Sequence, residues 1–258
     1  MKKMSSLIPI SRGIIGCLLF CLIWHISLSV STYFFNVAQL KNFMPYKAFE
    51  TLYGLLSTGF FWESVFSSLR RILIGLVFAF LLGVPAGLTI GVSKVVRHLT
   101  YGPIQFLRMI SPISWMPVAT LFLPGFEESI LFIITIAAIW PLLINTIQGV
   151  QNVNPNWINM AKNQGANERQ LLFKIIIPSS RPYIVTGLRL SIGVAWIVLV
   201  PAEMLGSSIG LGYLINDARD TMEYSKLTAV ILAIGIIGSI IDIFFQKIKS
   251  KYEWKPRV

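Results

Sequence analysis

The sequence predicts an all-α, polytopic membrane protein with about six transmembrane helices. The first observation is the composition, because 55% of the 258 residues are hydrophobic and only 13% are charged, whereas a soluble globular protein carries about 25% charged residues. The second is that apolar runs close to the ~20 residues a helix needs to cross a bilayer recur along the chain. The third is that lysine and arginine gather in alternate polar segments, as in multi-pass membrane proteins.

The apolar runs, taken in order, define the expected spans and the regions between them. We predict transmembrane helices over 13–35, 69–92, 102–123, 130–150, 182–205 and 227–245. The chain then divides into a first helix with an external segment, a membrane core with a polar cytoplasmic loop at 151–181, and a cytoplasmic tail, over 1–64, 65–248 and 249–258. No small-residue cleavage site follows the first apolar stretch, so we expect it to be retained as a helix.

The basic residues predict the orientation of the chain. With the N-terminus inside, the inner segments hold fourteen basic residues and only two acidic ones, Glu168 and Glu253, while the outer segments hold six basic and seven acidic residues. Basic loops stay on the cytoplasmic side, so both termini are predicted to be cytoplasmic. The net charge of +11 then needs no nucleic-acid partner. Arg70 and Arg71, at the outer end of the second span, fit this pattern least well.

Five small residues form a stripe along the second predicted span. They recur every four residues, on one face of a helix: Gly75, Ala79, Gly83, Gly87 and Gly91. Membrane helices approach each other closely through small residues. We favour packing within the chain over a seam between two copies as the purpose of this stripe.

The third predicted span contains an irregular segment from Ile110 to Pro117. Pro112 and Pro117 each remove a backbone donor, so a regular helix throughout is excluded. Broken backbone at membrane depth requires either surrounding protein or a water-filled cavity. The segment therefore has two readings, a lining of a translocation pathway or a simple proline kink. On the first reading its pathway residues are Ser111, Ser114, Trp115 and Met116.

Ionisable residues inside the spans are few, and such residues are functional candidates. Arg108 lies just before the broken segment, where it either faces a pathway or contacts lipid phosphate. Arg189 is the second cationic pathway candidate. Glu203 and Asp242 lie near span ends, from which they are expected to reach the interface. Arg189 and Glu203 are fourteen residues apart, about 21 Å along a helix, and cannot pair within it.

Catalytic and metal-binding patterns are missing from the sequence. His25 and His98 stand alone, without partners for catalysis or for a metal. The sequence contains no phosphate-binding loop of the Gly-x-x-x-x-Gly-Lys type. We therefore predict no catalytic residue, no metal site and no bound cofactor in this chain, and no ATP hydrolysis by the chain alone.

The polar loop at 151–181 predicts two capped helices. Asn154 is a good N-cap and Pro155 suits the first helical position, while Gly165 can end that helix. Asn167, with Gln170 three residues later, predicts a capping box for a second helix. We expect Pro178 to stop that second helix. Large apolar side chains on such an ordered cytoplasmic pair, Trp157 and Met160 here, point to a protein partner.

A family resemblance is carried by the spacing in this loop. Gly165 and Pro178 lie thirteen residues apart, with Phe173 and Ile175 between them. This frame, after a fourth span and before a fifth, resembles the coupling motif of ATP-binding-cassette importer permeases. That motif opens Glu-Ala-Ala, where this chain has Asn159-Met160-Ala161, so the family's acidic contact to its ATPase is missing. The resemblance implies ATPase contacts from Trp157, Asn159, Met160, Ala161, Gly165 and Ala166.

The resemblance covers 65–248 and looks most like the nitrate, sulfonate, taurine, bicarbonate and cyanate group. The segments similar to that group are Ser67–Arg71, Trp140–Thr146, Gly187–Arg189 and Ala202–Met204. Ser111-Pro112 followed by Trp115-Met116-Pro117 favours the nitrate, bicarbonate and cyanate branch.

This resemblance implies a type I importer permease fold in a bacterial cytoplasmic (inner) membrane. It also implies a homodimer in contact with membrane lipid, two cytoplasmic ATP-binding subunits that bind ATP and Mg, and an external substrate-binding protein. The expected function is a pathway for a small anion, operated by alternating access. The alternative is a secondary transporter driven by an ion gradient. That class usually shows an internal repeat and intramembrane acids, whereas we find no repeat and acids only near span ends.

Overall fold

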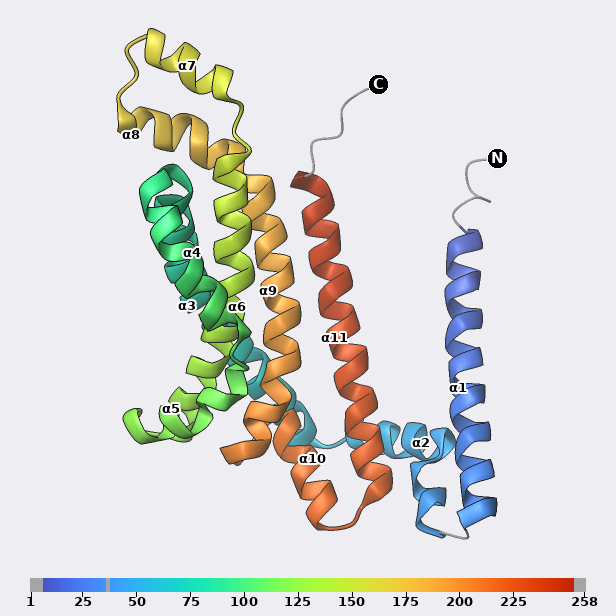
Figure 1. Cartoon of the computed structure of the whole chain (residues 1–258). Coiled ribbons are helices and arrows are strands. Elements are labelled where there is room, and N and C mark those ends of the chain that lie inside the picture. Colours follow the sequence, from blue (N-terminus) through green and yellow to red (C-terminus); the bar gives the residue numbers. More distant parts are fainter. Residues whose placement is uncertain (1–6, 36–37, 253–258) are drawn as a thin grey trace. The chain divides into compact units, whose positions relative to one another are not determined.

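The computed structural model describes residues 7–35 and 38–252, which fold as a series of helices (Figure 1). In chain order the elements are α1 (Leu7–Phe35), η1 (Ala38–Phe43), α2 (Pro45–Leu56), α3 (Gly59–Val92), α4 (Lys94–Met109), η2 (Pro112–Trp115), α5 (Met116–Phe122), α6 (Phe126–Gln151), α7 (Pro155–Asn163), α8 (Glu168–Leu171), η3 (Leu172–Ile176), α9 (Ile177–Gly206), α10 (Leu211–Asp220) and α11 (Tyr224–Tyr252). The all-α prediction is confirmed. Lys2, Lys3 and the end of the predicted tail, 253–258, lie outside the described residues.

Four helical segments of the described chain are long and apolar enough to cross a membrane. They are Gly59–Val92, Phe126–Gln151, Glu168–Gly206 and Tyr224–Lys247. Two shorter apolar helices, Leu18–Phe34 and Pro112–Phe122, fall within the first and third predicted spans. The chain is therefore a multi-pass membrane protein.

The third predicted span is broken, as the two prolines indicated. Helix α4 ends at Met109, Ile110 is extended and Ser111 is not helical, and the chain resumes as η2 and then α5. Both prolines stand in the first turns of these short helices, where a missing N–H is tolerated. The short polar stretch between the second and third predicted spans, around Lys94, was expected to be a loop, and this expectation is wrong. The Ser93 hydroxyl accepts a 3.3 Å bond from the Val96 N–H and caps α4, which begins at Lys94.

The described chain separates into two compact units. Among the described residues, the first comprises 7–35, 38–62 and 214–235, and the second comprises 63–213 and 236–252. In the first unit, Phe43 stacks on Tyr224 with ring centroids 5.1 Å apart. Lys226 forms ion pairs with Asp217 at 2.7 Å and Glu223 at 3.1 Å. These contacts hold the 3-10 segment η1 and the turn between α10 and α11 together within the unit.

The small-residue stripe of α3 packs against α6 in the second unit. A Cβ added at Gly87 would lie 2.6 Å from the Thr146 Cβ, and one at Gly91 would lie 2.6 Å from the Val150 Cβ. Ala79, between the glycines, is fully buried. The prediction that this stripe packs within the chain is confirmed, since glycine alone leaves room for helices this close.

Helices α6 and α9 form the centre of the second unit and lie side by side (Figure 1). Gly187 of α9 meets Pro141 and Asn145 of α6, while Gly149 of α6 meets Ser180 of α9. Both helices contribute buried side chains to the core of this unit, among them Ile130, Ile133, Ile134, Leu142, Ala195 and Leu199. These two helices are the scaffold on which the candidate sites stand.

Pro178 does not end a helix, so this prediction is wrong. The chain is helical from Glu168 to Gly206 through α8, η3 and α9. The segment just before the proline, Leu172–Ile176, is a π-helical turn, in which the Ile177 N–H bonds back to the Leu172 carbonyl. A proline ring clashes with the carbonyl one turn earlier in a regular helix, and a wider turn accommodates it. The second helix of the loop and the membrane helix consequently form one continuous helical rod, Glu168–Gly206.

Candidate functional site

Helix α7 and the turn after it form as their local sequence dictates. The Asn154 side chain accepts a 2.9 Å bond from the Asn156 N–H and caps the start of α7. Gly165 has φ +81, and its N–H bonds to the Lys162 carbonyl while the Ala166 N–H bonds to the Ala161 carbonyl. This pair of bonds is the Schellman motif, which places glycine at the left-handed position. The prediction that Gly165 ends the helix is confirmed.

The second predicted cap is also present. The Asn167 side chain accepts a 2.8 Å bond from the Gln170 N–H, and the Gln170 side chain accepts a 2.9 Å bond from the Asn167 N–H. This capping box begins the rod that continues as α9. Helix α7 and the rod are therefore joined by a short, hydrogen-bonded turn (Figure 1).

Helix α7 presents large apolar side chains to its surroundings. Trp157 is 54% exposed and Met160 is 60% exposed, and they lie three residues apart on one face. Ile158, by contrast, packs against a small cluster of Val150, Val153 and Ile176 at the adjoining ends of α6 and the rod. Asn159 is exposed and Ala161 is half-buried. One side chain thus anchors α7, and the neighbouring ones remain available to a partner.

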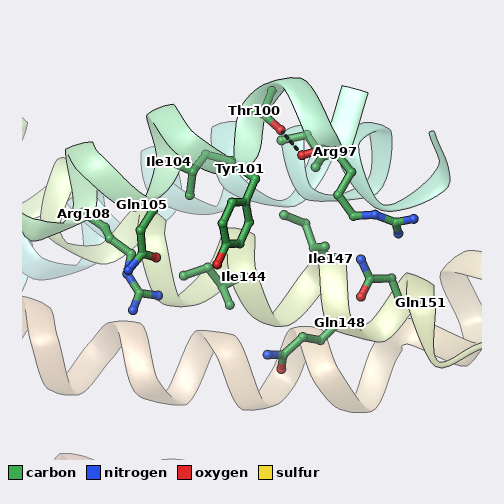
Figure 2. Close-up of a pocket in the computed structure, with 11 residues that line it drawn as sticks. Arg97, Thr100, Tyr101, Ile104, Gln105, Arg108, Ile144, Ile147, Gln148 and Gln151 are labelled. Carbon is green, nitrogen blue, oxygen red and sulfur yellow. Dashed lines mark hydrogen bonds between the residues drawn. The ribbon is translucent and has the colours of Figure 1, made fainter. Parts of the chain in front are cut away.

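Arg108 lines a cavity of about 220 Å³ between α4 and α6. Figure 2 shows Tyr101, Gln105 and Arg108 of α4 on the same side of their helix, turned toward Ile144 and Gln148 of α6. The full set of lining residues is Ile90, Arg97, Thr100, Tyr101, Ile104, Gln105, Arg108, Ile144, Ile147, Gln148 and Gln151. The lining carries two cations and no acid, an arrangement that attracts an anion.

The other predicted pathway residues do not line this cavity. Ser111 and Ser114 are exposed at the break between α4 and η2. Met116 is buried in the core of the second unit, against which Trp115 packs. Arg189 of α9 donates hydrogen bonds of 3.1–3.2 Å to both carboxylate oxygens of Asp242 on α11. The predicted pathway residues therefore do not form one site. Arg108 lines the cavity, and Ser111 and Ser114 lie at the break. Trp115 and Met116 belong to the core, and Arg189 forms an ion pair.

A buried polar cluster in the second unit was missed in the sequence. Arg71 is 2% exposed and donates bonds of 2.7 Å to Glu203 and 2.6 Å to Glu127. Glu203 is fully buried, so the expectation that it reaches the interface is wrong. Ser68 donates a 2.7 Å bond to Glu203, and the Gly212 N–H donates one of 2.8 Å. Arg70 pairs with Glu127 at 2.9 Å, so both arginines now have partners.

The sequence held one signal for this cluster. An arginine and a glutamate inside apolar spans each require an opposite charge, because an unpaired buried charge is costly. Their separation of 132 residues, however, is not a helical spacing, and three other ionisable residues competed for the pairing. The sequence therefore indicated which residues need a partner of opposite charge, but not which of them pair with each other.

Comparison with known families agrees with these observations. Residues 56–253 match the family model described as binding-protein-dependent transport system inner membrane component. The chain is 32% identical over 249 residues to the bicarbonate transport system permease protein CmpB of Synechocystis sp., covering 93% of this chain and 87% of CmpB. It is 34% identical over 215 residues to the nitrate import permease protein NrtB of Synechocystis sp., covering 80% and 78%. A putative ABC transporter permease protein of Methanocaldococcus jannaschii is 39% identical over 200 residues, covering 77% and 75%.

Solved structures share the fold. Inward-facing conformations of the methionine ABC transporter MetNI match with a TM-score of 0.67 at 15% identity, covering 77% of this chain and 100% of theirs. A bacterial alginate ABC transporter, solved in complex with an alginate pentasaccharide-bound periplasmic protein, matches with a TM-score of 0.66 at 15% identity, covering 97% of each chain. At this identity the likeness is one of fold.

Proposed function

This chain belongs to the family of inner membrane components of binding-protein-dependent transport systems, and from that premise we propose that it forms the translocation pathway for a small anion in an ATP-driven importer. It is a multi-pass ABC-type permease of the inner membrane. Its relatives include permeases named for bicarbonate and nitrate. The favoured substrates are nitrate, bicarbonate and cyanate, with sulfonate and taurine as further candidates.

The observation that carries the proposal is the exposed, doubly capped α7. Trp157 and Met160 offer apolar surface on a helix that stands away from the core, and large exposed apolar groups mark partner sites. The partner that fits is a cytoplasmic ATP-binding subunit, which also holds ATP and Mg. Asn159, Ala161, Gly165 and Ala166 complete the proposed contact face.

The rod from Glu168 to Gly206 supports a mechanical role for α7. A displacement of α7 passes through the Gly165 turn into a helix that continues unbroken across the membrane. Ile158 adds a second link, because it packs on the ends of α6 and the rod together. Closure of the ATPase subunits would thus tilt both central helices, which is the motion that alternating access requires.

The remaining partners complete the assembly. Two copies of this chain would form the pathway, each with an ATP-binding subunit, and an external protein would deliver the anion. Both termini and α7 would then lie on the cytoplasmic side, as the distribution of basic residues favours. Ser111 and Ser114 at the break, with Arg108, are the proposed polar lining, while Trp115 and Met116 support the break from the core side. The charge of Arg189 is balanced by Asp242, so its proposed role is to join α9 to α11.

Affinity purification from mild detergent, followed by an ATPase assay, tests the proposal. The informative variant is Trp157→Ala/Met160→Ala. Its control is Leu121→Ala/Phe122→Ala, which removes similar side chains, 82% and 83% exposed, from α5. We expect an ATPase subunit to co-purify with the wild type and the control and to be lost from the α7 variant. Purification of the wild type without any ATPase would overturn the proposal and favour a gradient-driven transporter.

A further inference from the structure

We propose that the cavity between α4 and α6 is a binding site for a small oxoanion. This inference deepens the proposed function and rests on it for the identity of the probe anions. The cavity of about 220 Å³ is several times the ~30 Å³ that one water occupies in the liquid, so an ion of nitrate or bicarbonate size fits with some of its hydration. All eleven lining residues belong to the second unit.

Two guanidinium groups supply the charge. Arg97 and Arg108 are eleven residues apart on α4, close to three full turns, so both lie on one stripe about 16 Å apart along the axis. Within the described part of the chain, Arg108 has no ion pair or hydrogen bond, and the Arg97 guanidinium has a single long one, 3.4 Å to the Gly91 carbonyl. Cationic donors with so few partners, in a cavity that no acidic residue lines, are poised for an anion.

Neutral donors supply the preference for an oxoanion. The side-chain amides of Gln105, Gln148 and Gln151 form no hydrogen bond in the described residues, and neither does the Tyr101 hydroxyl. Figure 2 shows Gln105 beside Arg108 at one end and Gln151 below Arg97 at the other, with Tyr101 between them. At either end of the cavity, an oxoanion offers acceptor atoms to a guanidinium and its neighbouring amide together. A halide offers one sphere of charge and satisfies fewer of them at once.

The two faces of α4 favour a free anion over a lipid head group. On the face opposite the arginines run Val95, Leu99, Phe106 and Met109, each 68–72% exposed. This apolar stripe is the surface suited to lipid tails or to a second copy. The arginine stripe is turned toward α6 instead, where Arg97 is half-buried and Arg108 is exposed.

The cavity is also connected to α7. Gln148 and Gln151 belong to the last turn of α6. Val150, between them, packs in the cluster that Ile158 of α7 joins. An anion bound to the glutamines and a partner bound to α7 therefore act on the same helix end, which gives the site a physical route to the ATPase.

Anion-dependent thermal stabilisation of the full-length chain in phosphatidylcholine nanodiscs tests the site, with no external binding protein present. The probes are nitrate, bicarbonate and chloride. The test variant is Arg97→Gln/Arg108→Gln. Its control, Lys94→Gln, removes a charge from the same helix outside the cavity. Because hydrogen bonds to charged groups are the strong ones, the half-saturating nitrate concentration should rise about tenfold or more in the test variant and less than about twofold in the control. Chloride should bind the wild type more weakly than nitrate or bicarbonate.

Three results would overturn the site. The first is that nitrate stabilises the wild type and the test variant equally. The second is that neither nitrate nor bicarbonate stabilises the wild type. The third is that Lys94→Gln loses as much nitrate affinity as the test variant does. A repeat with phosphatidylglycerol separates the two sources of anionic oxygen. If that lipid alone stabilises the wild type over the test variant while nitrate does not, the occupant is a head group. The assay needs no ATPase. It therefore measures anion binding to the cavity even if no ATPase subunit co-purifies and the proposed transport function fails.

Discussion

Arg71 and Glu203, 132 residues apart in the chain, are joined by a 2.7 Å hydrogen bond within a buried ion pair. The carboxylate also accepts bonds from the Ser68 hydroxyl and the Gly212 N–H, and the guanidinium reaches the Ile209 carbonyl at 2.8 Å. Helix α3, the end of α9 and the segment leading into α10 are thereby tied at one point. The cost of burying two charges is offset because each has several partners.

Glu203→Ala should destabilise the chain strongly, because it leaves Arg71 buried with only part of its countercharge. Breaking a buried pair costs about 3–5 kcal/mol, which corresponds to a fall in Tm of about 10 °C for a chain of this size. Thermal unfolding of the purified chain in detergent measures the effect. Asp220→Ala, which breaks an exposed pair with Arg219, should cost less than about 1 kcal/mol. Equal Tm values for the two variants would show that the buried pair contributes nothing.

Gly87→Ala should loosen the packing of α3 on α6. The added methyl group would lie 2.6 Å from the Thr146 Cβ and 2.9 Å from the Leu143 carbonyl oxygen, so the helices must move apart. Overpacking of this kind costs about 1–3 kcal/mol. Gly193→Ala is the matched control, since no atom lies within 4 Å of its Cβ position, and there alanine should be neutral or stabilising by about 0.5–1 kcal/mol. Thermal unfolding distinguishes the two, and a destabilised control with an unaffected Gly87 variant would contradict the packing described.

Gly165→Pro and Gly165→Val should uncouple ATP hydrolysis from transport while the membrane helices stay assembled. At φ +81 proline cannot be accommodated and a β-branched residue is strongly disfavoured. Gly165→Asn should retain coupling, because asparagine tolerates the left-handed region. Transport and ATPase activity are measured on the reconstituted complex, with gel filtration as the test of assembly. Normal transport by the proline variant would remove the α7 turn from the mechanism.

Arg189 and Asp242 should show energetic coupling in a double-mutant cycle. Their side chains are 26% and 59% exposed, so the interaction should be modest, about 0.5–1 kcal/mol. The measurement is the Tm of Arg189→Ala, Asp242→Ala and the double variant. Because Asp242 balances its charge, loss of Arg189 should affect stability more than the KM for the anion. A raised KM with an unchanged Tm would instead identify Arg189 as an exposed cation of the pathway.

Local features of this chain were predictable from sequence because their causes lie within a few residues. The apolar runs predicted the long helices, since length and hydropathy are summed along one segment. Asn154, Gly165 and Asn167 predicted the caps around α7, because each cap bonds a backbone group two to five residues away. The break at Ser111 followed from the two prolines beside it. The position of the chain in its family rested on the same local spacing.

Only the tertiary structure decided which distant groups meet. Glu203 and Asp242 looked alike in sequence, yet one is fully buried against Arg71 and the other is an accessible partner of Arg189. Pro178 looked like a stop, but a π-helical turn carries the helix past it. The cavity at Arg108 needs glutamines from α6, forty and more residues away. The sequence by itself determines the length, hydropathy and caps of each helix, because these depend on neighbouring residues. Charge pairs and cavities depend on how helices from distant parts of the chain are rotated against one another, which only the tertiary structure decides.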